Sequence, residues 1–81
     1  MARLRELGLD DNTVVMFTSD HGELLGERGL MFKGGLHCTG LTRVPFIWRD
    51  PAPQAPAAAA RAALAQTTDI AATVLARASL P

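Results

Sequence analysis

The apolar positions of this 81-residue chain fall into short separate clusters. In the first strong cluster, residues 13–18 (TVVMFT), β-branched and apolar residues follow one another without alternation. Such a run predicts a strand buried on both faces, as in a parallel sheet that helices cover. Residues 44–48 (VPFIW) predict a second short strand, since a proline at the start of a strand removes no ladder donor.

Helical spacing appears at the two ends of the chain. Leu4 and Leu7 stand among charged residues and predict a short helix over residues 1–7, which Gly8 would end in the left-handed conformation. Near the other end, residues 67–69 (TTD) offer an N-cap, and the apolar spacing that follows predicts a helix over residues 70–77. Two strands and two helices in this order predict an α/β chain.

The segments between these elements differ in character. Residues 19–40 hold six of the chain's seven glycines and show no sustained period. Loops of this length are usually functional or disordered, and the apolar residues within this one argue against disorder. Residues 50–65 are rich in proline and alanine, which is typical of a linker.

Composition narrows the classes of function. The formal net charge is zero, which argues against a nucleic-acid binder, because that class carries a basic excess. Seven of the eight acids and six of the eight bases lie in residues 1–50, so polar chemistry is expected there. A single cysteine excludes an internal disulfide, and no apolar run approaches the roughly 20 residues of a membrane-spanning helix. The N-terminus shows no signal peptide, and the compartment stays unknown.

An acid and an imidazole, Asp20 and His21, follow the first predicted strand directly. In open α/β sheets, ligands bind just beyond the carboxyl ends of strands, and carboxylate oxygen and imidazole nitrogen are both metal donors. The competing interpretation is that Asp20 caps a short helix and that His21 is merely solvated. Two ligands alone do not complete a metal site.

Further along the loop, Lys33 stands between a phenylalanine and two glycines. Its ammonium suits one oxygen of a sulfate or phosphate, while the alternative is a surface lysine lying over apolar side chains. His37 is a further candidate for lining the site. Zinc held with Cys38 is disfavoured, because the spacing matches no standard zinc arrangement. Arg43 is expected to form a structural ion pair with Glu23 or Glu27.

Four segments in this order resemble the sulfatase family of the alkaline-phosphatase-like superfamily. They are LRELGLDDNTVVMFTSDHGELLGERGL, FKGG, GLTRVPFIWRDP and TTDIAATVL. The resemblance covers nearly the whole chain and implies that residues 1–81 are part of a sulfatase catalytic domain. The fold that it implies is a fragment of an alkaline-phosphatase-like sandwich.

The resemblance also implies roles for the candidate residues. Asp20 and His21 match an acid-histidine pair at a divalent metal, with calcium preferred and magnesium or manganese as alternatives. Lys33 matches a lysine that contacts the sulfate group of the ester. In the family, a formylglycine hydrate attacks the sulfur while the metal acts as Lewis acid and template. Related members cleave phosphate monoesters, phosphate diesters or phosphonate esters.

Two departures from the family pattern limit what these residues can do. The formylglycine precursor lies in C/S-x-P-x-R, whereas Cys38 is followed by TGLT, so this chain holds no nucleophile. The Asp-Asp metal ligands of the N-terminal half are also absent. The chain alone is therefore expected to be inactive and to need the missing N-terminal half as a partner. The alternatives are a phosphoesterase or phosphonate hydrolase fragment and a non-catalytic remnant or interaction module.

The short length has a consequence for stability. A domain of this size buries only roughly 60% of the surface that its unfolded chain exposes. We therefore expect weak stability and an exposed apolar surface around Val14, Phe17, Phe46 and Ile47.

Overall fold

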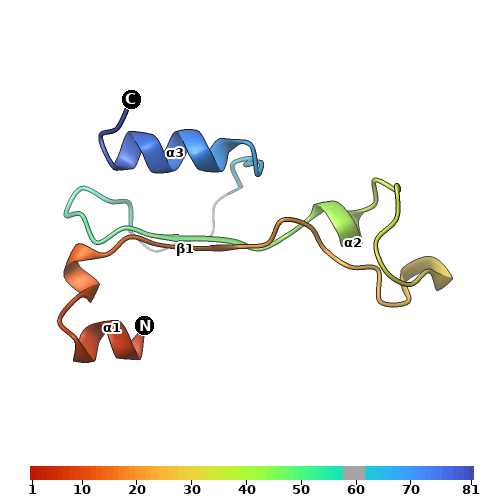
Figure 1. Ribbon diagram of the computed structural model, residues 1–81, viewed down its shortest axis with the longest axis horizontal. Coiled ribbons are helices and arrows are strands. Elements are labelled where there is room, and N and C mark those ends of the chain that lie inside the picture. The colour runs from red at the N-terminus through yellow and green to blue at the C-terminus, as the bar shows by residue number, and fades with distance from the viewer. Residues whose placement is uncertain (58–61) are drawn as a thin grey trace.

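The computed structural model describes residues 1–57 and 62–81 (Figure 1). Its elements are the helices α1 (Ala2–Glu6), α2 (Thr39–Thr42) and α3 (Asp69–Arg77), the 3₁₀ turns η1 (Asp10–Asn12) and η2 (Glu27–Gly29), and the strands β1 (Val15–Thr18) and β2 (Phe46–Arg49). Both predicted strands and both predicted helices form, each within about two residues of its expected bounds. The α/β class is confirmed, whereas the larger sandwich stays a prediction. Within the described ranges, no helix is long and apolar enough to cross a membrane.

The two strands form one antiparallel pair, with Val15 opposite Arg49 and Thr18 opposite Phe46. The prediction that β1 belongs to a parallel sheet is therefore wrong for this pair. A parallel partner requires a crossover that carries the chain back along the sheet. Here the loop after Thr18 returns to the end of the sheet that it left, so the second strand runs in the opposite direction (Figure 1).

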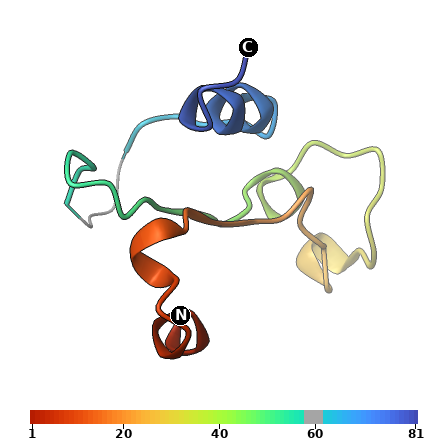
Figure 2. The same ribbon diagram turned by 60° about the vertical axis from the view of Figure 1, so that its left-hand side comes forward.

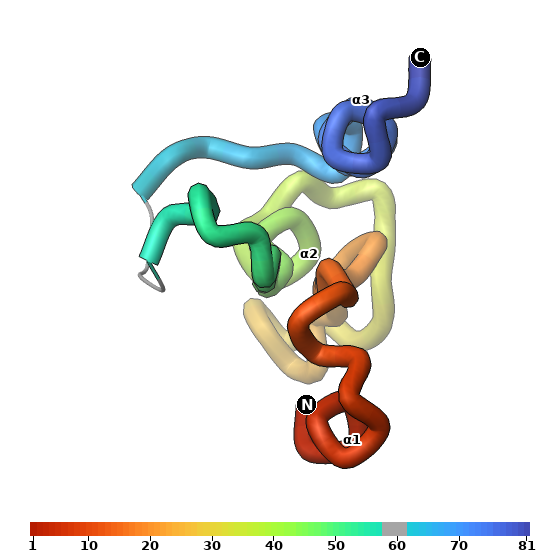
Figure 3. Tube along the Cα trace, turned by 90° about the vertical axis from the view of Figure 1, so that its left-hand side faces the viewer, coloured from red at the N-terminus to blue at the C-terminus, as the bar shows by residue number. Residues whose placement is uncertain are grey.

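The two faces of this sheet are covered unequally. Helix α3 lies along one face, where Met16 and Trp48 of the strands line a groove with Val74 of the helix (Figures 1 and 3). Successive side chains of a strand point to opposite faces, so Phe17 and Ile47 point away from α3. Each of them is 59% exposed. The prediction of a strand buried on both faces is therefore wrong.

The predicted exposed apolar surface is confirmed at three of its four positions. Phe17, Phe46 and Ile47 are exposed, whereas Val14 is half-buried because it lines the groove beneath α3. The chain is also open in shape, with a radius of gyration of 16.2 Å. A compact domain of this length would have about 12 Å. The exposed apolar side chains and the open shape agree with each other.

The first helix ends as its sequence predicts. Gly8 has φ +65°, in the left-handed region where a side chain would be strained. Its amide donates to the carbonyl of Arg5, and the amide of Leu9 donates to that of Leu4. These two bonds form a Schellman motif, which satisfies the last carbonyls of α1. The turn then leads into η1 and the start of β1 (Figure 2).

Helix α3 is joined to the end of β2 by an ion pair. The guanidinium of Arg77 donates to both carboxylate oxygens of Asp50, one of them at 3.0 Å. The predicted linker 50–65 lies between these elements and includes residues 58–61, which are outside the described residues. Its described first part, residues 50–57, contains neither helix nor strand. The linker itself stays a prediction.

The loop between the strands packs against itself at the far end of the sheet. Leu24 and Leu41 are 4% and 7% exposed, and they are the buried apolar side chains of the described residues. Leu41 lies in α2, which the sequence did not predict. Two buried leucines anchor this end of the molecule, which is where the candidate residues lie.

Candidate functional site

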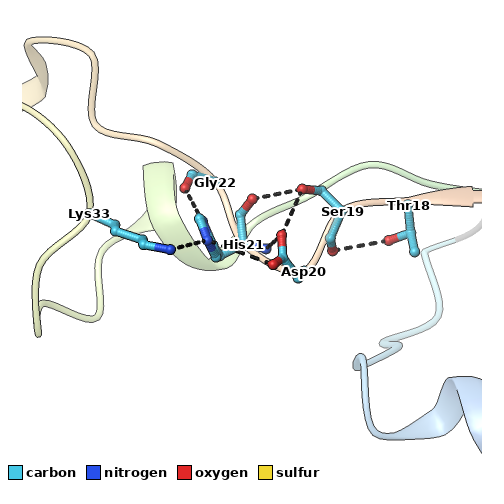
Figure 4. A network of polar contacts seen from close by, with 6 residues as sticks. All are labelled: Thr18, Ser19, Asp20, His21, Gly22 and Lys33. Carbon is cyan, nitrogen blue, oxygen red and sulfur yellow. Dashed lines mark hydrogen bonds and ion pairs between the residues drawn. The ribbon is translucent and has the colours of Figure 1, made fainter.

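The end of β1 turns sharply and presents three polar residues in succession (Figure 4). The Ser19 hydroxyl donates to the carbonyl of His21 at 2.8 Å, which folds the backbone over Asp20. The amide of His21 in turn donates to Asp20 Oδ1 at 2.9 Å. Short polar side chains that bond their own backbone favour such turns over regular structure. The strand therefore stops at Thr18, and Asp20 and His21 project beyond it.

Asp20 keeps one carboxylate oxygen free of these local bonds. Oδ1 accepts the His21 amide, while Oδ2 lies 3.7 Å from His21 Nε2. The side chain of Asp20 is 86% exposed. Hydrogen bonding from the His21 amide, aided by the charge of a protonated His21 ring, lowers the pKa of Asp20 below its usual 3.8. The group is thus a carboxylate at neutral pH, with one oxygen open to a cation.

The two ring nitrogens of His21 have different partners. Nδ1 lies 2.7 Å from the Gly22 carbonyl, and Nε2 lies 3.0 Å from Lys33 Nζ. A carbonyl only accepts hydrogen bonds and an ammonium only donates them. The network therefore assigns the proton to Nδ1 and leaves the lone pair on Nε2. Lys33, twelve residues along the chain, reaches this lone pair from the returning loop (Figure 4).

A close backbone crossing holds the loop behind His21. The Gly22 amide donates to the Leu41 carbonyl at 2.8 Å. A Cβ atom placed on Gly22 would lie 1.9 Å from the Gly40 carbonyl oxygen, so only glycine fits there without a backbone shift. This glycine crossing joins the start of the loop to α2.

Around these residues lies an open groove with a volume of about 1220 Å³. Its basic lining is formed by His21, Lys33, His37 and Arg43, whereas Asp20 is its acidic residue. Apolar side chains complete one wall, among them Leu36, Leu41, Val44, Phe46 and Ile70. The excess of basic groups suits an anion beside Lys33.

The sequence predictions for this region have mixed outcomes. Asp20, His21 and Lys33 come together as polar neighbours, so Lys33 is more than a lysine lying over apolar side chains. His37 lines the groove, but in the described part of the chain no hydrogen bond joins it to the other three. Asp20 caps no helix, because extended loop follows it. The predicted ion pair of Arg43 with Glu23 or Glu27 is wrong, because neither acid pairs with it among residues 1–57 and 62–81.

Three contributors to the site were missed by sequence reasoning. They are the Ser19 hydroxyl and the Gly22 carbonyl, which contact His21, and the Leu41 carbonyl, which accepts the Gly22 amide. A serine two residues before the histidine is a turn signal that could have indicated the role of the Ser19 hydroxyl. The two carbonyls belong to the backbone, so the residue types at these positions do not predict their contacts.

The donors present fit part of a site for a hard divalent cation. A calcium ion lies about 2.3–2.6 Å from each ligand, so two ligands of one ion are at most about 5 Å apart. Asp20 Oδ2 and His21 Nε2, at 3.7 Å, meet this condition. The described residues contain no group of three or more acidic, histidine or cysteine side chains that could hold a metal. The six to eight ligands that calcium takes would need donors beyond these two.

Comparison with known proteins decides the family. The family model described as Sulfatase matches residues 1–80. The chain belongs to the sulfatase family. Among curated sulfatases, it is 49% identical to a choline-sulfatase of Rhizobium meliloti (strain 1021) and 46% identical to the uncharacterized sulfatase YidJ of Escherichia coli (strain K12). Each match spans 41 residues, which are 51% of this chain and 8% of the relative.

A longer match involves a protein with a broader name. The multifunctional alkaline phosphatase superfamily protein PehA of Trinickia caryophylli is 34% identical over 74 residues. That match covers 91% of this sulfatase-family chain but 14% of PehA. The chain thus spans only a small part of the length of these relatives. No solved structure matches it significantly.

Proposed function

We propose that these 81 residues supply part of the active site of a sulfate-ester hydrolase. In this proposal, Asp20 and His21 are two ligands of a divalent cation, calcium by preference and magnesium or manganese as alternatives. Lys33 contacts an oxygen of the sulfate group. The nucleophile and the remaining ligands come from sequence outside these 81 residues, so the chain alone is inactive.

One observation carries this proposal. Lys33 Nζ lies 3.0 Å from His21 Nε2, and that nitrogen lies 3.7 Å from Asp20 Oδ2. Two potential ligands of a metal cation and one ammonium thus converge beyond the end of β1. A sulfate ester held there would meet the cation on one side and the ammonium on the other.

Each residue would make a separate contribution. Asp20 offers a full negative charge, and His21 offers a neutral nitrogen lone pair already turned toward Lys33. A bound cation supplies Lewis-acid neutralisation of the ester oxygens. When Lys33 leaves His21 for the ester, its ammonium stabilises negative charge that develops during cleavage. His37, on the wall of the same groove, is a further polar group within the proposed site.

A second candidate is hydrolysis of phosphate or phosphonate esters. The match to PehA, which covers 91% of this chain, favours this candidate. Sulfate and phosphate both present tetrahedral oxygens to a cation and an ammonium, so the residues of this chain serve either anion. The sulfate ester remains the main proposal because the family model and several relatives are sulfatases.

The test uses the longest protein encoded in frame with these residues. Its hydrolysis of 4-nitrophenyl sulfate, 4-nitrophenyl phosphate and a phenyl phosphonate ester is compared in the presence of calcium, magnesium or manganese. We expect the sulfate ester to give the highest kcat/KM. We expect Lys33→Ala to lower kcat by about 10²–10³-fold, the usual loss when one charge-stabilising donor is removed.

Arg28→Ala is the matched control, because Arg28 is an exposed base in the same loop and does not line the groove. It is expected to leave kcat within a factor of two or so. A preference for the phosphate or phosphonate ester would support the second candidate. Absence of hydrolysis of all three esters would support a non-catalytic remnant or interaction module.

A further inference from the structure

Two hydrogen bonds of the Gly22 backbone link α2 to the imidazole of His21. The Leu41 carbonyl accepts the Gly22 amide at 2.8 Å, and the Gly22 carbonyl lies 2.7 Å from His21 Nδ1. These contacts join two segments that are about twenty residues apart. They end at the side chain whose other nitrogen faces Lys33 (Figure 4).

We propose that Gly22 and Leu41 are positioning residues that hold His21 in the Nδ1–H tautomer through their backbone groups. This inference rests on the proposed function, because its consequence is a lone pair on Nε2 that is open to a cation. Histidines that bind metals generally donate their other ring N–H to a carbonyl or carboxylate, which fixes the ring and its tautomer. Here the Gly22 carbonyl would do this, on a residue whose amide donates to the Leu41 carbonyl.

The surroundings of the ring disfavour the opposite tautomer. With the proton on Nε2, that N–H would point at the Lys33 ammonium, which has no lone pair to accept it. Asp20 Oδ2, at 3.7 Å from Nε2, is beyond hydrogen-bond distance. The bare Nδ1 would then face the Gly22 carbonyl oxygen, which also has only lone pairs to offer. Both nitrogens would lose their partners.

The residue that anchors these hydrogen bonds is buried, whereas residues 25–37 of the loop are exposed. Leu41 is 7% exposed, and its own amide donates to the Cys38 carbonyl at 3.0 Å. Gly22 must approach this segment closely, since a Cβ there would meet the Gly40 carbonyl oxygen at 1.9 Å. A substitution at Gly22 therefore displaces the carbonyl that faces His21 while leaving the imidazole itself intact.

The experiment reads the tautomer directly. Nitrogen-15 NMR of the full 81-residue chain, free of metal and at a pH where the ring is neutral, distinguishes a protonated Nδ1 from a protonated Nε2. We expect His21 to be Nδ1–H, while His37 shows the Nε2–H form that an unconstrained imidazole favours. In Gly22→Ala, the tautomer ratio of His21 is expected to shift toward Nε2–H by about tenfold, the effect of losing one hydrogen bond.

Gly34→Ala is the matched control, because a Cβ there meets nothing within 4 Å. It should leave the His21 tautomer unchanged. An Nε2–H form of His21 in the unsubstituted chain would overturn the proposal, and so would an unchanged ratio in a folded Gly22→Ala. If Gly22→Ala does not fold, hydrogen exchange of the Gly22 amide in the unsubstituted chain is the deciding measurement. A protected Gly22 amide together with an Nδ1–H His21 supports the proposal, and an unprotected Gly22 amide refutes it. Because no metal or ester is present, the outcome is independent of whether the chain serves a hydrolase.

Discussion

His21 has two nitrogens with unlike neighbours, and this asymmetry determines what the residue can offer. Nδ1 faces the Gly22 carbonyl, whereas Nε2 faces the Lys33 ammonium, whose place a metal cation could take. Asp20 shows the same division between its two oxygens, because Oδ1 accepts the His21 amide and Oδ2 does not. At the scale of single residues, each side chain therefore combines one contact to the backbone with one atom that could bind a metal cation.

Removal of the Asp20 charge should weaken cation binding. We expect Asp20→Asn to raise the Kd of the full chain for Mn²⁺ about tenfold or more, since such affinities depend strongly on the number of charged ligands. Paramagnetic broadening of the His21 ring signals during Mn²⁺ titration measures this change. Asp11→Asn removes the same charge from an exposed residue at the other end of β1 and should leave the Kd unchanged. Equal effects of the two substitutions would indicate general charge attraction instead of a site.

Ser79 occupies a backbone conformation that suits glycine. Its φ is +56°, and the Leu80 amide bonds back to the Leu75 carbonyl in a turn like the one that ends α1. We expect Ser79→Gly to stabilise α3 by about 1 kcal/mol, because a left-handed residue with a Cβ is strained by that order. Slower amide hydrogen exchange within α3 measures the gain. Ser79→Ala keeps the Cβ and should show no such slowing.

At the scale of elements, an ion pair between Arg77 and Asp50 adds to the apolar contacts that hold α3 against the sheet. The Arg77 hydrogen bonds, followed by that from the Ala52 amide, lower the pKa of Asp50 below its usual 3.8. A group whose pKa is lower in the folded chain stabilises that state above its unfolded pKa, and the contribution is lost as the pH falls through the folded pKa. The docking of α3 should therefore weaken in acid, below about pH 4.

Trp48 is the chain's single tryptophan and lines the groove against α3, so its emission reports the docking. We expect the emission to shift to longer wavelength below about pH 4 and to be constant from there to neutral pH. In Asp50→Asn, the acid step should be absent and the emission should already be shifted at neutral pH. Asp11→Asn, an acid distant from Trp48 in sequence, should retain the step. Retention of the step in Asp50→Asn would assign it to another carboxylate.

The elements themselves were predictable from local signals, whereas their pairing was not. Apolar runs predicted both strands, and Gly8 predicted the end of α1, because these signals act within a few residues. The direction of pairing depends on the path of the loop between the strands, which has no periodic pattern. Helix α2 was missed because four residues with a central glycine carry almost no helical signal. For the site, residue types and order indicated Asp20, His21 and Lys33, but their distances depend on that loop path.

At the scale of the whole molecule, the sheet has a covered face and an open one. Phe17 and Ile47 are each 59% exposed, and the described residues bury only Leu24 and Leu41 among their apolar side chains. Hydrophobic burial is the main favourable term in folding, so this chain gains little of it. We therefore expect thermal unfolding without a sharp cooperative transition.

The open face should also make the chain bind apolar dyes and self-associate. Replacement of both Phe17 and Ile47 by threonine places β-branched residues, which suit strands, at both positions while removing apolar surface. We expect lower dye fluorescence and a smaller sedimentation coefficient, with the far-UV circular dichroism retained. Met16→Thr, on the face that α3 covers, should instead loosen α3 without reducing self-association. Unchanged dye binding in the double variant would show that the dye binds to a surface other than the open face of the sheet.

The Leu41 carbonyl has a consequence for how this site can change by mutation. Every residue type carries a carbonyl, so no point substitution at position 41 deletes the oxygen that accepts the Gly22 amide. A histidine oriented by a carboxylate can lose its partner when that one side chain is exchanged, whereas His21 loses its partner only when the backbone moves, as in Gly22→Ala. Insertion or deletion of one residue between positions 22 and 41 would instead alter the geometry of the crossing. The acceptor oxygen at position 41 is thus independent of the side chain, provided that an apolar residue still fills this buried position, and the crossing is sensitive to the length of the loop.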